Sequence, residues 1–177
     1  MLPISIDNVN NGNCSMQHSN DVIAESVSVS DRETTSLFDQ LGGLPALQRV
    51  HRIFYDKLYA HPWLKHFFAG HNQQAIEDRQ SAFMATKMGG KVNYWGKQPR
   101  MAHRHMYITE ELFNLRHELL RRSLDEAGIA RPLAQRWLRI DAAFKRQIVK
   151  ESIESFYRVT WNYEKRIIVP RSRASDE

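Results

Sequence analysis

Apolar residues recur along the middle of the chain at the three- and four-residue spacing of amphipathic helices. Four such stripes follow one another, and each places an apolar face opposite a charged one. They comprise Leu44, Leu47, Val50, Phe54 and Leu58; Ile76, Gln80, Phe83 and Met84; Leu112, Leu115, Leu119 and Leu120; and Leu133, Trp137, Ile140, Phe144 and Ile148. Each segment is therefore predicted to be a helix that buries one side.

Residues typical of helix ends lie between these stripes. Gly42 separates a short first helix from the second, and Gly89 follows a helix predicted at about residues 72–88. Thr109 is a candidate N-cap before two glutamates, and Pro132 fits the first turn of the next helix. These positions predict an all-α domain at residues 35–157, with a loose stretch at about 89–103.

The two ends of the chain differ from this helical middle. Residues 1–34 are rich in Asn, Ser and Asp and lack aromatic residues, so we expect a disordered leader. Residues 158–177 form a basic tail with aromatic residues, and the β-like run at 166–170 is too short to predict a strand. We expect the last helix to continue past Lys150 through Phe156, so that the extension lengthens it.

Composition narrows the class of protein. Of the 177 residues, 42% are hydrophobic and 25% are charged, as in a typical soluble globular chain. No apolar run approaches the ~18 residues that a spanning helix needs, so we expect no membrane span. The single cysteine, Cys14, excludes an intrachain disulfide and cysteine-based zinc or iron–sulfur sites. Together with an N-terminus unlike a secretory signal, this predicts a cytoplasmic protein.

The net charge of +5 raises the hypothesis of a nucleic-acid partner. Residues 1–33 carry a net charge of −4, however, so the remainder of the chain carries +9. The basic residues of that remainder are dispersed over the polar faces of the predicted helices, where exposure to solvent accounts for them. We therefore expect no nucleic-acid partner.

Histidines are candidates for chemistry in a chain that lacks the GxGxxG, Walker A, GxSxG and HExxH motifs. His61, His66 and His71 are interpreted as surface residues, because a five-residue step turns each roughly 140° from the last on a helix. His103 and His105 lie in the loose stretch ahead of a capped helix. Their spacing lets only one of the two face a given ligand.

Two blocks of sequence carry a more specific pattern. The first is LFDQLGG followed by FYDKLYAHPWLKHFFAGHN. The second begins with Gln80-Ser81-Ala82-Phe83 and continues with MGG, Tyr94 and Gly96. It ends with His103, which lies five residues before Ile108-Thr109. In order and spacing these blocks resemble the truncated haemoglobins, the short bacterial globins, over about residues 36–148. The resemblance implies a globin-like, two-over-two helical sandwich that binds haem b through its iron.

The resemblance also implies roles for particular residues. His103 matches the proximal histidine that binds iron, with His105 as its competitor. Tyr55 and Gln80 match the distal residues that act on the bound ligand and are the candidate catalytic residues. Phe68 matches the phenylalanine that packs on the haem plane, and Ile76 matches the position at which larger globins have histidine. Phe83 and Met84 match positions that line the ligand access, and packing in the core is an equal alternative for both.

Charged residues near the implied pocket have two interpretations. Arg79 matches a position that binds a haem propionate in part of the family, and Lys97 and Arg100 are further candidates; ordinary solvated charge is the alternative for each. Arg116 and His117 depart from the family, which usually has apolar or aromatic residues there, near the proximal rim of the haem. Either the helix is rotated slightly, or a charge lies close to the pocket.

The resemblance implies reversible binding of O₂, with CO and NO as further ligands. It is also compatible with nitric-oxide dioxygenation, in which O₂ and NO give nitrate and ferric haem, and with a peroxidase-like reaction. Because the chain has no flavin or nicotinamide motif, such turnover needs an external reductase. A haem-based gas sensor that signals through the terminal extensions is one alternative, and a haemless basic helical binding protein is another.

Overall fold

The computed structural model describes residues 35–159 and 165–171. The predicted disordered leader and most of the predicted basic tail lie outside these residues. Within them the chain forms helices joined by loops, and the nearest approach to a sheet is an isolated parallel bridge between Met106 and Ile167. The helices are α1 (Leu37–Gln40), α2 (Gly43–Ala60), the 3₁₀ helix η1 (Leu64–Phe68), α3 (Gln73–Lys87), α4 (Pro99–Ala102), α5 (Glu110–Glu126), α6 (Arg131–Ala143), α7 (Lys145–Ile148) and α8 (Ile153–Val159).

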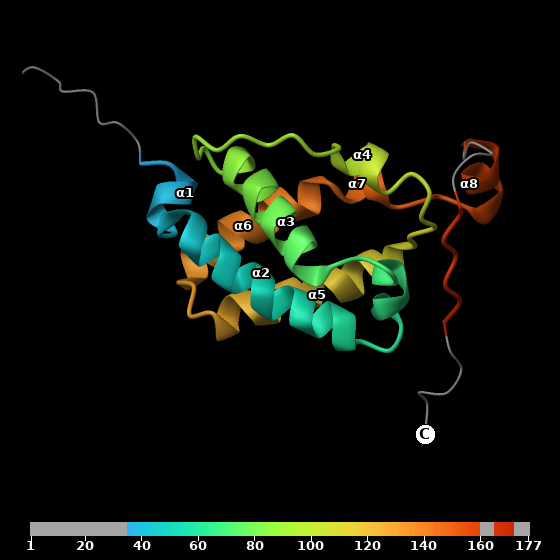
Figure 1. Cartoon of the computed structure of the whole chain (residues 1–177), viewed down its shortest axis with the longest axis horizontal. Helices are drawn as coiled ribbons and strands as arrows, with labels where there is room; N and C mark the ends of the chain where they lie inside the picture. The colour runs from blue at the N-terminus through green and yellow to red at the C-terminus, as the bar shows by residue number, and fades with distance from the viewer. Residues whose placement is uncertain (1–34, 160–164, 172–177) are drawn as a thin grey trace, which may run out of the picture. The chain divides into compact units, whose positions relative to one another are not determined.

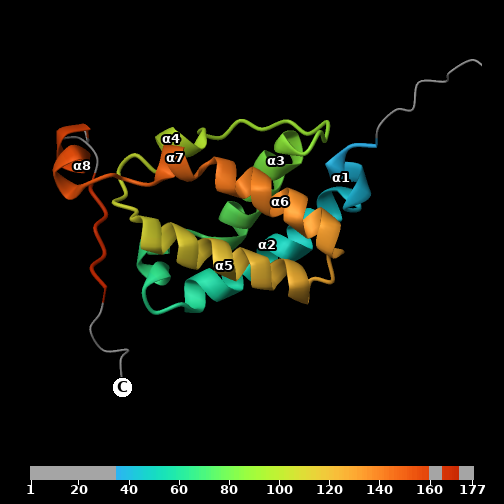
Figure 2. The same cartoon turned by 180° about the vertical axis from the view of Figure 1, so that it is seen from behind.

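Four long helices build the core. α2 packs against α3, α5 packs against α6, and α2 also contacts α5, so that two helix pairs meet (Figures 1 and 2). The apolar stripes predicted from the sequence form the contact, since Val50 and Phe54 of α2, Leu124 of α5 and Trp137 of α6 are all fully buried. The all-α prediction is confirmed. No helix in the described ranges is long and apolar enough to cross a bilayer.

The helix ends follow local chemistry. The Thr109 hydroxyl accepts a hydrogen bond from the Leu112 N–H at 3.3 Å, as predicted for an N-cap. The Asn72 side chain accepts one from the Ala75 N–H at 2.9 Å and begins α3. Gly89 follows that helix with a φ of +91°, a conformation that favours glycine. The predicted helix at residues 72–88 is therefore confirmed to within one residue at each end.

The prediction that the extension lengthens the last helix is wrong. α6 ends at Ala143, α7 is a single turn, and Val149 is extended with φ −68° and ψ 139°. The N–H of Lys150 then donates to the carbonyl of Ile108 at 2.9 Å, outside any helix. Ser152 begins the separate helix α8, because its hydroxyl accepts a hydrogen bond from the Ser155 N–H at 3.1 Å.

The segment at residues 165–171 lies against the loop that follows α4. The N–H of Tyr107 donates to the carbonyl of Ile167 at 2.8 Å, and the N–H of Ile167 donates to the carbonyl of His105 at 2.9 Å. The indole N–H of Trp63, just before η1, donates to the carbonyl of Val169 at 3.0 Å. These three hydrogen bonds hold the segment against two parts of the chain that are far away in sequence.

Candidate functional site

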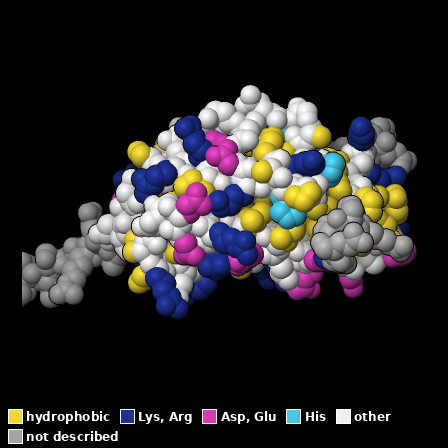
Figure 3. Space-filling view, turned by 90° about the horizontal axis from the view of Figure 1, so that it is seen from below, with side chains coloured by type: hydrophobic (Ala, Val, Ile, Leu, Met, Phe, Trp, Pro, Cys, Tyr) yellow, Lys and Arg dark blue, Asp and Glu magenta, His cyan; other side chains and the backbone are white. Residues whose placement is uncertain are grey.

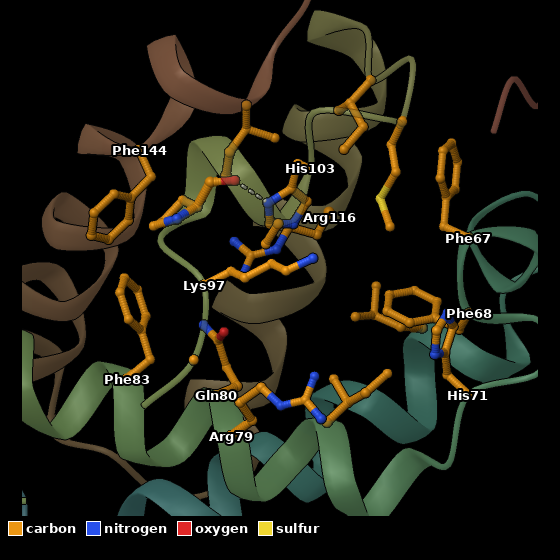
Figure 4. A pocket seen from close by; sticks show the side chains of 18 of the residues that line it. Phe67, Phe68, His71, Arg79, Gln80, Phe83, Lys97, His103, Arg116 and Phe144 are labelled. Carbon is orange, nitrogen blue, oxygen red and sulfur yellow. Dashed lines mark hydrogen bonds between the residues drawn. The ribbon is translucent and has the colours of Figure 1, made fainter. Parts of the chain in front are cut away.

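A cavity of about 620 Å³ lies among these helices (Figure 4). This volume is within the range of pockets that hold small ligands and cofactors. Its wall is mainly apolar, with many aromatic rings: Tyr55, Phe67, Phe68, Phe83, Tyr94, Trp95, Phe113 and Phe144. The chain therefore surrounds one large apolar space with side chains from helices that are distant in sequence.

The cavity brings together nearly all of the residues predicted from the sequence. Those that line it are Tyr55, Phe68, Ile76, Arg79, Gln80, Phe83, Lys97, His103 and His105. Arg100 is exposed on α4 and does not belong to the lining. Met84 is 1% exposed and packs in the hydrophobic core, which is the alternative that the sequence left open for it.

His103 follows α4 directly, and its imidazole is held by a hydrogen bond to the backbone of that helix. Its Nδ1 lies 2.8 Å from the carbonyl oxygen of Pro99 (Figure 4). A carbonyl oxygen can only accept, so Nδ1 carries the proton and Nε2 keeps its lone pair. Burial lowers the pKa of His103 to about 4, with the positive charge of Arg116 acting in the same direction and the Pro99 hydrogen bond against it. The imidazole is therefore neutral near pH 7, the form that binds metals.

Tyr55 on α2 and Gln80 on α3 place two polar side chains in the apolar wall. Neither side chain has a hydrogen-bond partner in the part of the chain that the structure describes, and the Gln80 amide points into the cavity (Figure 4). Burial raises the pKa of Tyr55, so its hydroxyl stays protonated and remains a donor. Because buried polar groups are normally paired, two unpaired donors favour a ligand in this cavity.

Aromatic contacts fix the walls beside these donors. The Phe68 ring meets Tyr55 edge-on at 5.9 Å and stacks on Tyr59 at 5.1 Å. On the other side, the Phe83 ring lies 5.2 Å from Tyr94 and 5.3 Å from Phe144. Such ring pairs are rigid and apolar, so they form firm apolar walls on two sides of the cavity.

Cationic side chains lie at the exposed part of the lining. Arg79 and Lys97 are exposed and extend toward the cavity from α3 and from the loop before α4 (Figure 4). His71 is exposed, as predicted from the sequence, but it also lines the cavity. The loop between η1 and α3 carries His71 to the cavity wall, and only the tertiary structure shows this.

An ion pair inside the wall was not predicted from the sequence. Arg116 of α5 binds Asp141 of α6, with Nη1 at 2.5 Å from each carboxylate oxygen, and both residues line the cavity. The prediction that a charge lies close to the pocket is thus confirmed for Arg116. A clue was present in the pattern, because Arg116 is four residues after Leu112 and Asp141 four after Trp137, so each charge shares a face with a buried apolar residue.

The surface shows interleaved charges. On the face drawn in Figure 3, Lys and Arg side chains alternate with Asp and Glu, while apolar side chains gather around two histidines. On α5, Arg121 pairs with Glu118 and Asp125, and Arg122 pairs with Glu118. On α5 as well, acidic side chains therefore lie beside the basic ones.

Comparison with known proteins decides the family. The family model described as bacterial-like globin matches residues 36–150 of the chain. The chain belongs to the truncated haemoglobins. The Group 1 truncated hemoglobin of Tetrahymena thermophila is 30% identical to this globin over 99 residues, which are 56% of this chain and 82% of the relative. The Group 1 truncated hemoglobin GlbN of Mycolicibacterium paratuberculosis is 33% identical over 97 residues, 55% of this chain and 71% of the relative.

Solved structures show the same fold. The truncated hemoglobin of Tetrahymena pyriformis in its Fe(III) form aligns with a TM-score of 0.61 at 24% identity, covering 66% of this globin and 99% of that chain. The structure of Chlamydomonas reinhardtii THB1 aligns with a TM-score of 0.56 at 28% identity, covering 66% and 98%. The two-over-two globin fold is therefore confirmed. Globins of this family are haem proteins that bind gases such as O₂, so haem b is the cofactor of this globin.

The cavity fits haem on its own chemistry. Its lining is largely apolar and aromatic, as the porphyrin requires, and His103 is a neutral imidazole with a free lone pair on Nε2. Arg79 and Lys97 at the exposed part can meet the two carboxylates of the cofactor. The structure thus supplies a metal ligand, an apolar space and counter-charges in one place.

Proposed function

We propose that this globin binds O₂, CO and NO reversibly at haem held by His103, with Tyr55 and Gln80 acting on the gas ligand. The observation that carries the proposal is that one apolar cavity holds a neutral histidine and two donors without partners. When bound there, haem iron supplies the coordination position for the gas. The other contributions come from side chains of this chain.

Tyr55 and Gln80 would donate hydrogen bonds to a polarised ligand in the cavity. Both donors lie among aromatic rings, and a hydrogen bond in such a dry surrounding is stronger than one in water. Ile76 is apolar and half-buried, so it does not compete with the two donors. Phe68, which Tyr55 and Tyr59 hold from two sides, is suited to pack on the flat cofactor.

Arg79 and Lys97 are the proposed partners of the propionates. Both are exposed and reach the cavity from different segments, so each can pair with one carboxylate without burying a charge. Arg100 would serve only as a contact outside the lining, because its side chain lies on the exposed face of α4. For His105, the structure offers a place in the lining, but the Pro99 hydrogen bond that orients an imidazole is made by His103.

An enzymatic role would be nitric-oxide dioxygenation, in which O₂ and NO combine to nitrate. This reaction leaves ferric iron, so an external reductase would supply one electron for each turnover. A peroxidase-like reaction would likewise need an outside reducing substrate. Nitrate production in the presence of NO and a reducing system, compared between the wild type and Tyr55→Phe, would test the proposal. A location in the cytoplasm belongs to the same proposal and is tested by cell fractionation.

A gas sensor is the second candidate, and the C-terminal segment favours it. The backbone of Ile167 is hydrogen-bonded to His105 and Tyr107, which follow the proposed iron ligand by only a few residues. Movement of His103 on ligand binding would therefore reach residues 165–171 directly. Deleting residues 158–177 while following both O₂ kinetics and a cellular response separates a sensor from a simple binder.

The deciding experiment is the absorption spectrum of the purified protein with added hemin. We expect a Soret band in the wild type and in His105→Ala, and loss of the normal proximal spectrum in His103→Ala. A wild type without a Soret band would refute the proposed function. A normal proximal spectrum in His103→Ala would refute the ligand assignment and transfer it to His105.

A further inference from the structure

The ion pair between Arg116 and Asp141 places a fixed charge in the wall of the cavity. The carboxylate of Asp141 is completely engaged, because Arg116 Nη1 reaches both of its oxygens at 2.5 Å and His117 Nδ1 lies 2.8 Å from Oδ2. Burial alone would raise the pKa of Asp141, but Arg116 and His117 outweigh it and hold that pKa below its ordinary value. Asp141 is therefore an anion at neutral pH, and it fixes the guanidinium in position.

The two ends of this pair are not equally buried. The Asp141 side chain is 5% exposed, whereas that of Arg116 is 24% exposed. The Nε and Nη2 groups of Arg116 have no hydrogen-bond partner among the described residues, and neither atom is fully buried. Arg116 lines the cavity, and its guanidinium keeps two groups there that can still donate hydrogen bonds. Both members of the pair line the cavity, and Arg116 is the more exposed of the two and keeps donors that are still unused.

The guanidinium lies close to the proposed ligand site. Its central carbon is 4.9 Å from the centre of the Phe54 ring, next to Tyr55 in the chain. The positive charge of Arg116 also acts on Tyr55, because it opposes the effect of burial on the pKa of that hydroxyl. In Figure 4 Arg116 lies beside His103 and away from Arg79.

We propose that Arg116 forms an anion subsite inside the cavity, which raises the affinity of this globin for small monovalent anions such as azide and nitrite relative to neutral gases. A guanidinium donates charge-assisted hydrogen bonds to an anion, and these are roughly twice as strong as hydrogen bonds between neutral groups. It stabilises a bound neutral diatomic gas much less. Asp141, which is itself hydrogen-bonded to His117, holds the guanidinium in place, so little entropy is lost when an anion arrives. The proposal rests on the proposed function, because the anion shares the haem-bearing cavity.

The test removes both charges together. Removal of Arg116 alone would leave a buried carboxylate without its partner, which is strongly destabilising. The double variant Arg116→Met with Asp141→Leu keeps the net charge and replaces the pair by apolar side chains of similar volume. Azide and nitrite are titrated into the ferric protein, and CO into the ferrous protein, and each is followed by its absorption spectrum.

We expect the double variant to bind azide and nitrite about tenfold or more weakly, since a hydrogen bond to a charged group is lost. Its CO affinity should stay within about twofold of the wild type. Arg122→Met, which removes an exposed charge of the same helix that does not line the cavity, should leave all three affinities unchanged. Equal azide and nitrite affinities in the double variant and the wild type, with CO binding intact, would overturn the subsite.

A conservative variant guards against simple misfolding. Arg116→Lys keeps a positive charge in the wall, so azide affinity should stay closer to that of the wild type than to that of the double variant. A loss in Arg116→Lys as large as in the double variant would point to disturbed packing and refute the subsite. Absence of a Soret band in the wild type would refute the proposed function instead, so the two failures are distinguishable.

Discussion

Nδ1 of His51 lies 2.8 Å from the hydroxyl oxygen of Ser81, and both side chains are completely buried between α2 and α3. The imidazole also meets the edge of Trp137 at 5.4 Å. Burial lowers the pKa of His51 to about 3, with Arg116 acting in the same direction and Asp141 against it. His51 is thus a neutral core residue that links three helices, and protonation of it would place an uncompensated charge in the core.

This relationship predicts a loss of stability in acid. An unfolded histidine titrates near pH 6.5, whereas folded His51 does so only near 3, so between these values the unfolded state binds more protons. The free energy of unfolding should therefore fall as the pH drops from about 6.5 toward 3, by up to about 1.4 kcal/mol for each pH unit. Urea unfolding at several pH values measures this slope.

The variant His51→Gln supplies the comparison. It keeps a hydrogen-bonding group opposite Ser81 but cannot be protonated, so its stability should depend less steeply on pH in the same window. His103 also has a lowered pKa, but it is present in both proteins and cancels in the difference. Identical slopes for His51→Gln and the wild type would show that His51 is not the titrating group.

Removal of the cavity donors should speed the loss of O₂. Tyr55→Phe deletes one hydroxyl without changing the ring, and Gln80→Leu deletes one amide of similar size. Each lost hydrogen bond costs about 1 kcal/mol, so each variant should release O₂ roughly fivefold faster in stopped-flow measurements. Tyr59→Phe is the matched control, because the Tyr59 hydroxyl donates to the carbonyl of His71 at 3.0 Å and not into the cavity. Unchanged release in both cavity variants would contradict their proposed role.

The C-terminal segment should stabilise the loop that carries His103. Ending the chain after residue 164 removes three hydrogen bonds, to His105, Tyr107 and Trp63, and should lower the free energy of unfolding by about 2–3 kcal/mol. We also expect hemin to transfer several-fold faster from this variant to an apoglobin acceptor. A chain that ends after residue 171 keeps all three bonds and should behave as the wild type. If both truncations lost hemin at the same rate, the segment would have no such role.

Two glycines with positive φ should differ in their tolerance of alanine. At Gly89, with φ +91°, an added Cβ would lie 2.9 Å from the Cβ of Ser36. At Gly128, with φ +71°, an added Cβ would meet nothing within 4 Å. Gly128→Ala should therefore cost only the left-handed backbone strain of about 1 kcal/mol, and Gly89→Ala about 1–2 kcal/mol more. Thermal unfolding of the two variants measures the difference, and equal losses would contradict it.

Much of the fold was predictable because helices are locally determined. The stripe from Leu47 to Leu58 follows the 3.6-residue period, and Thr109 and Gly89 act through hydrogen bonds and backbone angles within a few residues. The family resemblance placed Tyr55, Gln80 and His103, and the fold indeed brings them to one cavity. The sequence by itself therefore determined the long helices and the faces that they bury, and its family resemblance named many of the residues that line the cavity.

The tertiary structure alone decided the partners of the charges and the course of the extension. Arg116 and Asp141 are 25 residues apart, and only the packing of α5 on α6 joins them and leaves the guanidinium open to the cavity. Val149 ends a pattern that could have continued as helix, because the Lys150 N–H finds the carbonyl of Ile108 instead. These contacts join groups that are distant in sequence, and the local spacing of hydrophobic residues does not predict which distant groups will meet.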